Sequence, residues 1–183
     1  MNDRNIIFIG FMGVGKTTVG QLVAQKLNRK FIDTDEEIEK EYGIATSEIF
    51  KKFGEKVFRE KEMSLIISLC KQKNLVVSLG GGAFLQEEIR NACLASCIVI
   101  FLDLTFEKWR ERINLIIESR PVLNGKSIEE MKELFYKRQE IYSNHHIKID
   151  TDNKEVEDIA DQIIKLLENR RLQNLVHTEE GDI

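Results

Sequence analysis

The chain has 183 residues, of which 42% are hydrophobic and 32% are charged, and its formal net charge is −4. These values are typical of one globular domain and exclude a disordered chain. The weakly acidic balance argues against broad binding to nucleic acids or anionic membranes, so the positive charge of any phosphate site must be local.

Three further observations bear on the cellular compartment of the protein. The three cysteines, at positions 70, 93 and 97, lack Cys-x-x-Cys spacing and indicate neither a disulfide framework nor a zinc site. No apolar run reaches the roughly 18 residues of a membrane span, and the N-terminus lacks a signal-peptide pattern. We therefore expect a cytoplasmic protein without membrane or nucleic-acid partners.

The first predicted elements form a phosphate-binding unit. Residues 5–9 are a short apolar run typical of a buried parallel strand, and residues 18–28 have the apolar spacing of a helix. Between them, residues 10–17 read Gly-Phe-Met-Gly-Val-Gly-Lys-Thr, the pattern of a phosphate-binding loop. In such a unit the backbone N–H groups and the helix N-terminus bind phosphate. Lys16 then reaches the β- and γ-phosphates, and the Thr17 hydroxyl can ligate Mg²⁺.

The rest of the chain alternates between strands and helices. Further strands are predicted over residues 30–33, 75–79, 97–102 and 147–149. Helices are predicted after a cap at Thr34, around residues 49–53, and over 55–73, 87–95, 106–113, 128–143 and 156–169. This order predicts an α/β fold with three α/β/α layers and a five-stranded parallel sheet, whose ligands lie beyond the carboxyl ends of the strands. Residues 1–171 are expected to form the single domain, with a mobile lid at about 112–127, and residues 172–183 a disordered polar tail.

Two predicted strands end in residues that can bind a metal ion or a ligand. Asp33 and Asp35 are two apart, so one can hold Mg²⁺ through water while the other accepts hydrogen bonds from a hydroxyl-bearing substrate. Helix capping is the alternative for this pair. Gly80, Gly81 and Gly82 follow the next strand, and three glycines in a row allow close backbone approach to a ligand.

Three arginines are candidates for binding anions. Arg59 and Glu62 are three apart on a predicted helix, where they form either a solvated surface pair or a held anion-binding arginine. Arg120 precedes the only proline, in the long irregular stretch, where a lid arginine could stabilise a transferring phosphoryl group. Arg138 precedes Tyr142 by one helical turn, and packing or surface charge is its alternative role.

Taken together, these motifs resemble the shikimate kinase family of P-loop kinases, a type related to the nucleoside-monophosphate kinases. The resemblance covers about residues 5–168 and rests on the phosphate loop, Asp33-Thr34-Asp35, Phe50-x-x-Phe-Gly-Glu-x-x-Phe-Arg-x-x-Glu62, the triple glycine, Arg120-Pro121 and Arg138-x-x-x-Tyr142. It implies an ATP-dependent phosphotransferase that phosphorylates the 3-hydroxyl of shikimate in the route to aromatic amino acids, with Mg²⁺ as cofactor.

The resemblance also implies residue roles. ATP phosphates would be bound by Gly13, Val14, Gly15, Lys16, Thr17, Thr18 and Arg120, with Thr17 and Asp33 at the metal. Shikimate would be bound by Asp35, Arg59, Glu62, Gly80, Gly81, Gly82 and Arg138. Lys16, Asp35 and Arg120 would act in the chemical step. The lid departs from the family pattern, which leaves Arg112 as the candidate for an adenine contact.

Other functions remain open from the sequence. A related kinase for another small hydroxy acid, such as gluconate, would need a different anion clamp. A catalytically silent regulatory module of the same fold would lose Lys16, Thr17 or Asp35, and all three are present. A nucleotide-dependent switch should expose a partner surface, which nothing in the sequence requires. We expect a monomer, because the sequence shows no exposed heptad pattern or long apolar edge that would require a partner.

Overall fold

The computed structural model describes residues 3–113 and 127–179, with side chains described as far as residue 170. Its centre is a five-stranded sheet of β1 (Ile6–Ile9), β2 (Lys30–Asp33), β3 (Leu75–Ser78), β4 (Ile98–Asp103) and β5 (Ile147–Asp150). The strand order is β2-β3-β1-β4-β5, and every neighbouring pair is parallel. All four residues of β1 are buried, as expected for a central strand covered on both faces.

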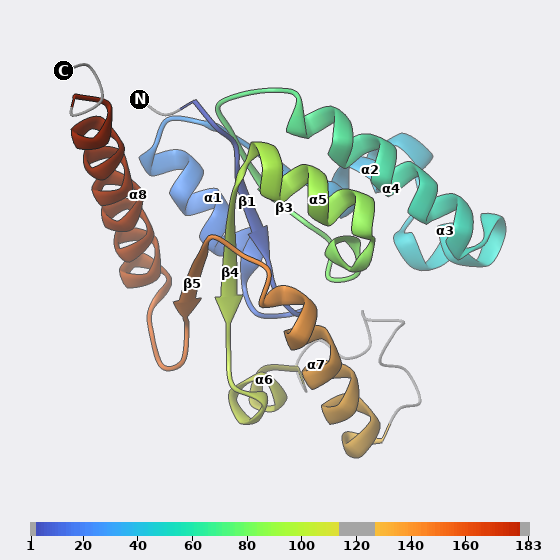
Figure 1. Cartoon of the computed structure of the whole chain (residues 1–183). Helices are drawn as coiled ribbons and strands as arrows, with labels where there is room; N and C mark the ends of the chain where they lie inside the picture. The colour runs from blue at the N-terminus through green and yellow to red at the C-terminus, as the bar shows by residue number, and fades with distance from the viewer. Residues whose placement is uncertain (1–2, 114–126, 180–183) are drawn as a thin grey trace.

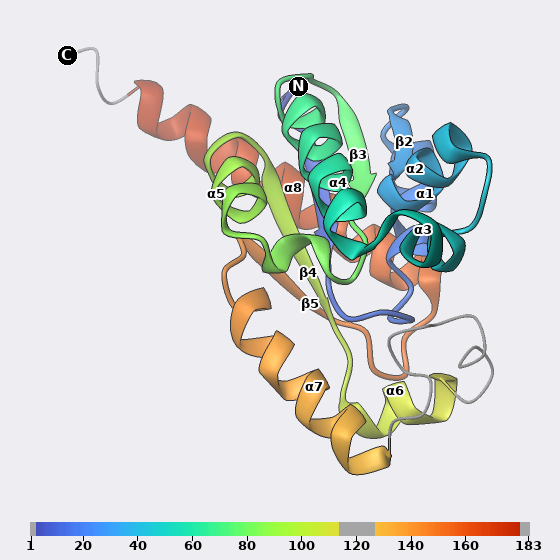
Figure 2. The same ribbon diagram turned by 90° about the vertical axis from the view of Figure 1, so that its right-hand side faces the viewer.

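Helices cover both faces of the sheet (Figures 1 and 2). On one side, α1 (Lys16–Lys26) packs against α8 (Val156–Glu179); on the other, α4 (Glu55–Cys70) packs against α5 (Glu87–Ser96). The helices α6 (Phe106–Ile113) and α7 (Ile128–Tyr142) lie beyond the arrowheads of β4 and β5 in Figure 1. The carboxyl ends of the strands therefore face the elements that carry the predicted site.

A small helical lobe stands beside the sheet. It consists of α2 (Thr34–Tyr42), α3 (Thr46–Phe53) and the start of α4, which lie together on the side away from α8 (Figure 1). Its own core contains Ile38, Ile49 and Phe58, separate from the main core around the sheet. Helix α4 joins the two cores, because Phe58 belongs to the core of the lobe while Ile66 and Leu69 belong to the main core.

The predicted three-layer architecture and its five parallel strands are confirmed, and most element bounds agree to within a few residues. Two local predictions are wrong. Asp33, not Thr34, is the N-cap of α2, because the Asp33 carboxylate accepts the first free N–H groups of the helix. Helix α8 does not end near Asn169 but continues to Glu179, through most of the stretch expected as a disordered tail. The predicted lid falls largely on residues 114–126, outside the described residues.

In the described part of the chain, no helix combines the length and the apolar character that crossing a membrane requires.

Candidate active site

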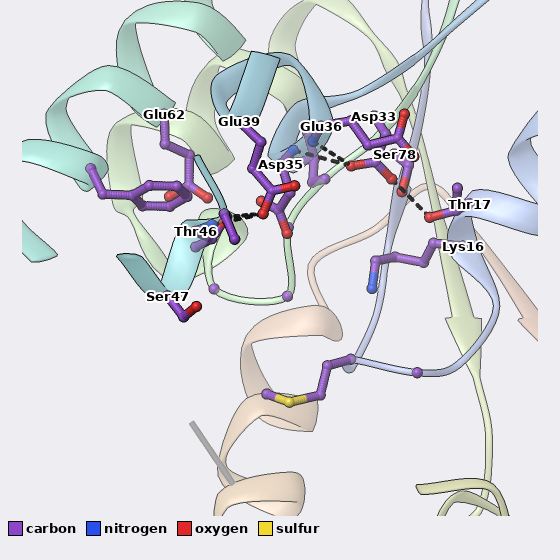
Figure 3. Close-up of a pocket in the computed structure, with 18 of the residues that line it drawn as sticks. Lys16, Thr17, Asp33, Asp35, Glu36, Glu39, Thr46, Ser47, Glu62 and Ser78 are labelled. Carbon is purple, nitrogen blue, oxygen red and sulfur yellow. Dashed lines mark hydrogen bonds between the residues drawn. The ribbon is translucent and has the colours of Figure 1, made fainter. Parts of the chain in front are cut away.

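A pocket of about 490 Å³ opens at the carboxyl ends of β1, β2 and β3. Figure 3 shows Lys16 and Thr17 at one end of it, Glu39, Thr46 and Glu62 at the other, and Asp33 and Asp35 between them. The phosphate loop and the helical lobe therefore face the same cavity.

The phosphate loop concentrates positive charge at one end of the pocket. Gly15 is the N-cap of α1 and has a φ of 99°, a left-handed conformation that glycine adopts without steric cost. The Lys16 side chain is buried against the loop, and its Nζ donates to the carbonyl oxygens of Gly10 (2.9 Å) and Phe11 (3.0 Å). An anion here would meet the ammonium group, the loop N–H groups and the positive end of α1 together.

The loop is braced from outside by an aromatic cluster. Trp109 of α6 is fully buried, and its Nε1 donates to the Met12 carbonyl oxygen at 2.8 Å. The Phe11 ring packs edge-on against Trp109 at a centroid distance of 5.1 Å and against Phe135 at 5.0 Å. These contacts fix the backbone of the loop relative to α6 and α7.

Asp33 connects the phosphate loop to the helical lobe. Its Oδ2 accepts a hydrogen bond from the Thr17 hydroxyl at 2.8 Å, and its Oδ1 caps α2 by accepting from the N–H groups of Asp35 (3.1 Å) and Glu36 (3.4 Å). One oxygen of the Asp33 carboxylate thus caps α2, while the other bonds Thr17, the second residue predicted at the metal.

Thr17 and Asp33 fit a magnesium site. Both offer hard oxygen donors beside the phosphate loop, which is the donor chemistry that Mg²⁺ prefers. Among the described residues no cluster of three or more His, Cys, Asp or Glu side chains could hold a metal. A Mg²⁺ ion at Thr17 and Asp33 would therefore complete its coordination with phosphate oxygens and water, as is usual for nucleotide sites.

Asp35 lies in the first turn of α2 and lines the middle of the pocket. It lies so close to the triple glycine that a Cβ added to Gly80 would stand 2.3 Å from its Oδ1. The Thr34 hydroxyl joins the two segments, because it donates to the Ser78 carbonyl oxygen (3.3 Å) and accepts from the Gly80 N–H (3.1 Å). The end of β3 thus holds the Asp35 carboxylate at a defined place in the cavity.

Arg59 is half-buried and pairs with a fully buried Glu62, so the alternative of a solvated surface pair is wrong. Arg59 Nη1 donates to Glu62 Oε2 at 2.7 Å, and the Glu62 side chain is only 1% exposed. Burial raises the pKa of Glu62 to about 7, although the Arg59 charge acts in the opposite direction. The guanidinium also lies over the rings of Phe50 and Phe58, with its Cζ 5.9 and 5.4 Å from their centroids.

A second arginine approaches the triple glycine from the opposite helix. Arg138 of α7 is buried, and its Nη1 donates to the Gly81 carbonyl oxygen at 3.3 Å, which also accepts from the Tyr142 hydroxyl at 2.6 Å. On the other side, a Cβ on Gly82 would lie 2.7 Å from Nη2 of Arg59. The two arginines thus converge on one glycine turn, an arrangement that suits a carboxylate.

The pocket contains most of the predicted site residues. Those that line it are Gly13, Gly15, Lys16, Thr17, Thr18, Asp33, Asp35, Arg59, Glu62, Gly80, Gly81, Gly82 and Arg138. Val14 is a buried core residue and does not line the cavity. Arg120 lies outside the described residues, and Arg112 is exposed near the end of α6.

The helical lobe contributes a wall of the pocket that no sequence motif predicts. This wall includes Glu36, Glu39, Thr46 and Ser47, from α2 and the start of α3. Acidic residues on a charged helix are usually solvated, so only the placement of α2 over the sheet edge identifies them as pocket residues.

Comparisons with known proteins agree on one family. The shikimate kinase family model matches residues 12–168. A shikimate kinase of Bacillus licheniformis is 54% identical over 168 residues, covering 91% of this chain and 95% of that protein.

Solved structures give the same result. A shikimate kinase of Acinetobacter baumannii in complex with shikimate is 34% identical with a TM-score of 0.86, covering 92% of this chain and 95% of that one. A gluconokinase of Sinorhizobium meliloti, 17% identical over 93% of this chain and 97% of its own with a TM-score of 0.55, shares the fold alone. With the family model spanning most of its length, the chain belongs to the shikimate kinase family.

Proposed function

We propose that this protein is a shikimate kinase, which transfers the γ-phosphoryl group of ATP to the 3-hydroxyl of shikimate and releases ADP and shikimate 3-phosphate. The observation that carries the proposal is the convergence of Arg59 and Arg138 on the triple glycine, in the same pocket as Asp35 and the phosphate loop. A small hydroxy acid needs a cationic clamp for its carboxylate and an acceptor for its hydroxyl, and both are present.

The two ends of the pocket bind different reactants. The N–H groups of the phosphate loop, with Lys16, bind the β- and γ-phosphates and stabilise the charge that spreads over the transferring group. Thr17 and Asp33 hold Mg²⁺, which when bound neutralises charge on the phosphate oxygens. Arg59 and Arg138 bind the carboxylate and thereby fix the orientation of the ring.

Asp35 acts on the nucleophile. The Asp35 carboxylate accepts a hydrogen bond from the attacking hydroxyl and then takes the hydroxyl proton. As the proton leaves, the hydroxyl oxygen bonds to the γ-phosphorus, and the bond from the γ-phosphorus to the β–γ bridging oxygen breaks. The proposed role of Arg120, approach to the nucleotide phosphates on lid closure, rests on the Arg120-Pro121 motif alone. We further propose that the enzyme acts as a monomer in the cytoplasm.

The test is ADP release by the purified protein with Mg²⁺ and ATP, in the presence of shikimate, gluconate or no acceptor. We expect stimulation by shikimate only, and its loss in Lys16→Met, which keeps the length of the side chain but removes the ammonium group. Stimulation by gluconate would identify a related hydroxy-acid kinase. Binding of ATP without stimulation by either acid would favour the regulatory-module alternative.

A further inference from the structure

Gln86 begins helix α5, but this helix does not explain the direction of the Gln86 side chain. It is the N-cap of α5 and follows the short turn of residues 83–85 after the triple glycine. An N-cap side chain usually accepts from the first turn of its helix, but no such bond is present here. Instead, Gln86 Nε2 donates to Glu62 Oε2 at 2.8 Å.

The same carboxylate oxygen holds Arg59. Glu62 Oε2 accepts from Arg59 Nη1 (2.7 Å) and from Gln86 Nε2 (2.8 Å), whereas Glu62 Oε1 is buried and has no hydrogen-bond partner among the described residues. A buried carboxylate with one unpaired oxygen depends strongly on the bonds it retains. Gln86 supplies one of these two bonds.

Glu62 is the only buried carboxylate among the described residues that pairs with Arg59. The rings of Phe50 and Phe58 also contact the guanidinium, but a ring face does not fix its rotation as a hydrogen bond does. The other carboxylate partner of Arg59, Glu55, accepts at 3.2 and 3.3 Å and is 64% exposed, so solvent screens this ion pair. The orientation of the guanidinium over the triple glycine therefore depends mainly on Glu62.

We propose that Gln86 is a positioning residue for the acid-binding arginine: by bonding Glu62 Oε2 it orients the carboxylate that holds Arg59 over the triple glycine. This inference rests on the proposed function, because it concerns the residue that binds the substrate carboxylate. Gln86 acts through Glu62 and does not line the pocket.

The charge state of Glu62 gives this role a specific signature. The charged groups that act on Glu62 are Arg59, which lowers its pKa, and Asp35, which raises it, while the bond from Gln86 also lowers it. Removing the amide donor raises the pKa of Glu62 further, so that more of the carboxyl is protonated near neutral pH and its pairing with Arg59 weakens.

The experiment compares wild type with Gln86→Met, which keeps the length of the side chain and removes the donor. At neutral pH we expect KM for shikimate to rise roughly tenfold, the typical effect of losing one hydrogen bond to a charged group, with KM for ATP nearly unchanged. The acid limb of the pH profile of kcat/KM for shikimate should move to higher pH, so that the two enzymes differ least in alkaline buffer. Gln72→Met, the same change at an exposed position just after the end of α4, is the matched control and should leave both profiles unchanged.

Two outcomes overturn the proposal. One is a Gln86→Met enzyme with wild-type KM and pH profile; the other is an equal loss of affinity for both substrates at every pH, which would indicate a purely structural role. Failure of the proposed function is separate, because it shows in the wild type as no shikimate-dependent ADP release.

Discussion

At the scale of single residues, the triple glycine is explained by its neighbours more than by its backbone. Gly82 has an ordinary φ of −101°, and Gly80 and Gly81 are not among the residues with positive φ. What these glycines share is contact with functional groups: a Cβ on Gly80 would meet Asp35, and one on Gly82 would meet Arg59. Three glycines in a row predict close approach to a ligand; the structure shows close approach to Asp35 and Arg59, which we propose bind it.

Gly82→Ala tests this explanation. Because the backbone tolerates alanine, we expect the fold to persist while the new methyl displaces the Arg59 guanidinium, raising KM for shikimate roughly tenfold or more and leaving KM for ATP unchanged. The measurement is a double-mutant cycle with Arg59→Ala, which itself should cost shikimate affinity without affecting ATP.

The cycle separates two explanations. In the Arg59→Ala background, Gly82→Ala should add little, because the group that it displaces is already gone. Fully additive effects would show that the methyl acts on something other than Arg59.

At the scale of elements, the N-terminus of helix α3 is capped by a side chain of helix α2. Its N-cap, Ala45, offers no side-chain acceptor, and Glu39 of α2 takes that place. Glu39 Oε1 accepts from the Thr46 N–H at 2.7 Å and from the Thr46 hydroxyl at 2.9 Å, as drawn in Figure 3. The carboxylate thus joins two helices of the lobe at the wall of the pocket.

Glu39→Ala should therefore loosen α3. We expect a loss of about 1 kcal/mol in the free energy of unfolding, the usual cost of removing a helix cap, together with a higher KM for shikimate and an unchanged KM for ATP. Glu37→Ala is the matched control, because Glu37 lies on the same helix and pairs with the exposed Lys40. Equal effects of the two variants in urea denaturation and kinetics would contradict the capping role.

Elements with strong local patterns were predictable, and the relations between elements were not. Strand β2 and helix α6 have the bounds that apolar spacing and turn residues predict. The Glu39 cap depends on how α2 meets α3, which no periodicity encodes. The Arg59–Glu62 pair has a helical spacing that is usually exposed, and only the packing of α4 against the turn before α5 buries it.

At the scale of the whole molecule, two groups drive the pH dependence of stability in opposite directions. The pKa of Glu62 is raised by burial from 4.5 to about 7, so between these values the unfolded chain binds fewer protons and stability falls as pH rises. Burial, with the nearby Arg4 and Arg170, lowers the pKa of His146 below 6.5, so the unfolded chain binds more protons and stability falls as pH decreases through that value.

The hydrogen bonds of His146 agree with a lowered pKa and a loss of stability at acid pH. The imidazole Nδ1 of His146 accepts from the Val99 N–H at 3.0 Å, and the backbone N–H of His146 donates to the Val99 carbonyl oxygen at 2.9 Å, at the start of the β4–β5 pairing. Protonation of Nδ1 would remove the first of these bonds, so the neutral imidazole is the form that holds the edge strand.

Single variants should separate the two contributions. Glu62→Gln should abolish the loss of stability, of the order of 2 kcal/mol, that accompanies a rise in pH from 4.5 to about 7. His146→Gln should flatten the acid side below 6.5 and leave the Glu62 contribution intact. Urea denaturation across this range is the measurement, and curves for both variants parallel to that of the wild type would refute the assignment.

The bond from Trp109 to the phosphate loop has a spectroscopic consequence. Trp109 is the only tryptophan of the chain, and its indole N–H is bonded to the Met12 carbonyl oxygen beside the nucleotide end of the pocket. Tryptophan emission from this protein therefore comes from one buried position in direct contact with the loop, so the enzyme carries an intrinsic optical probe there and needs no introduced label.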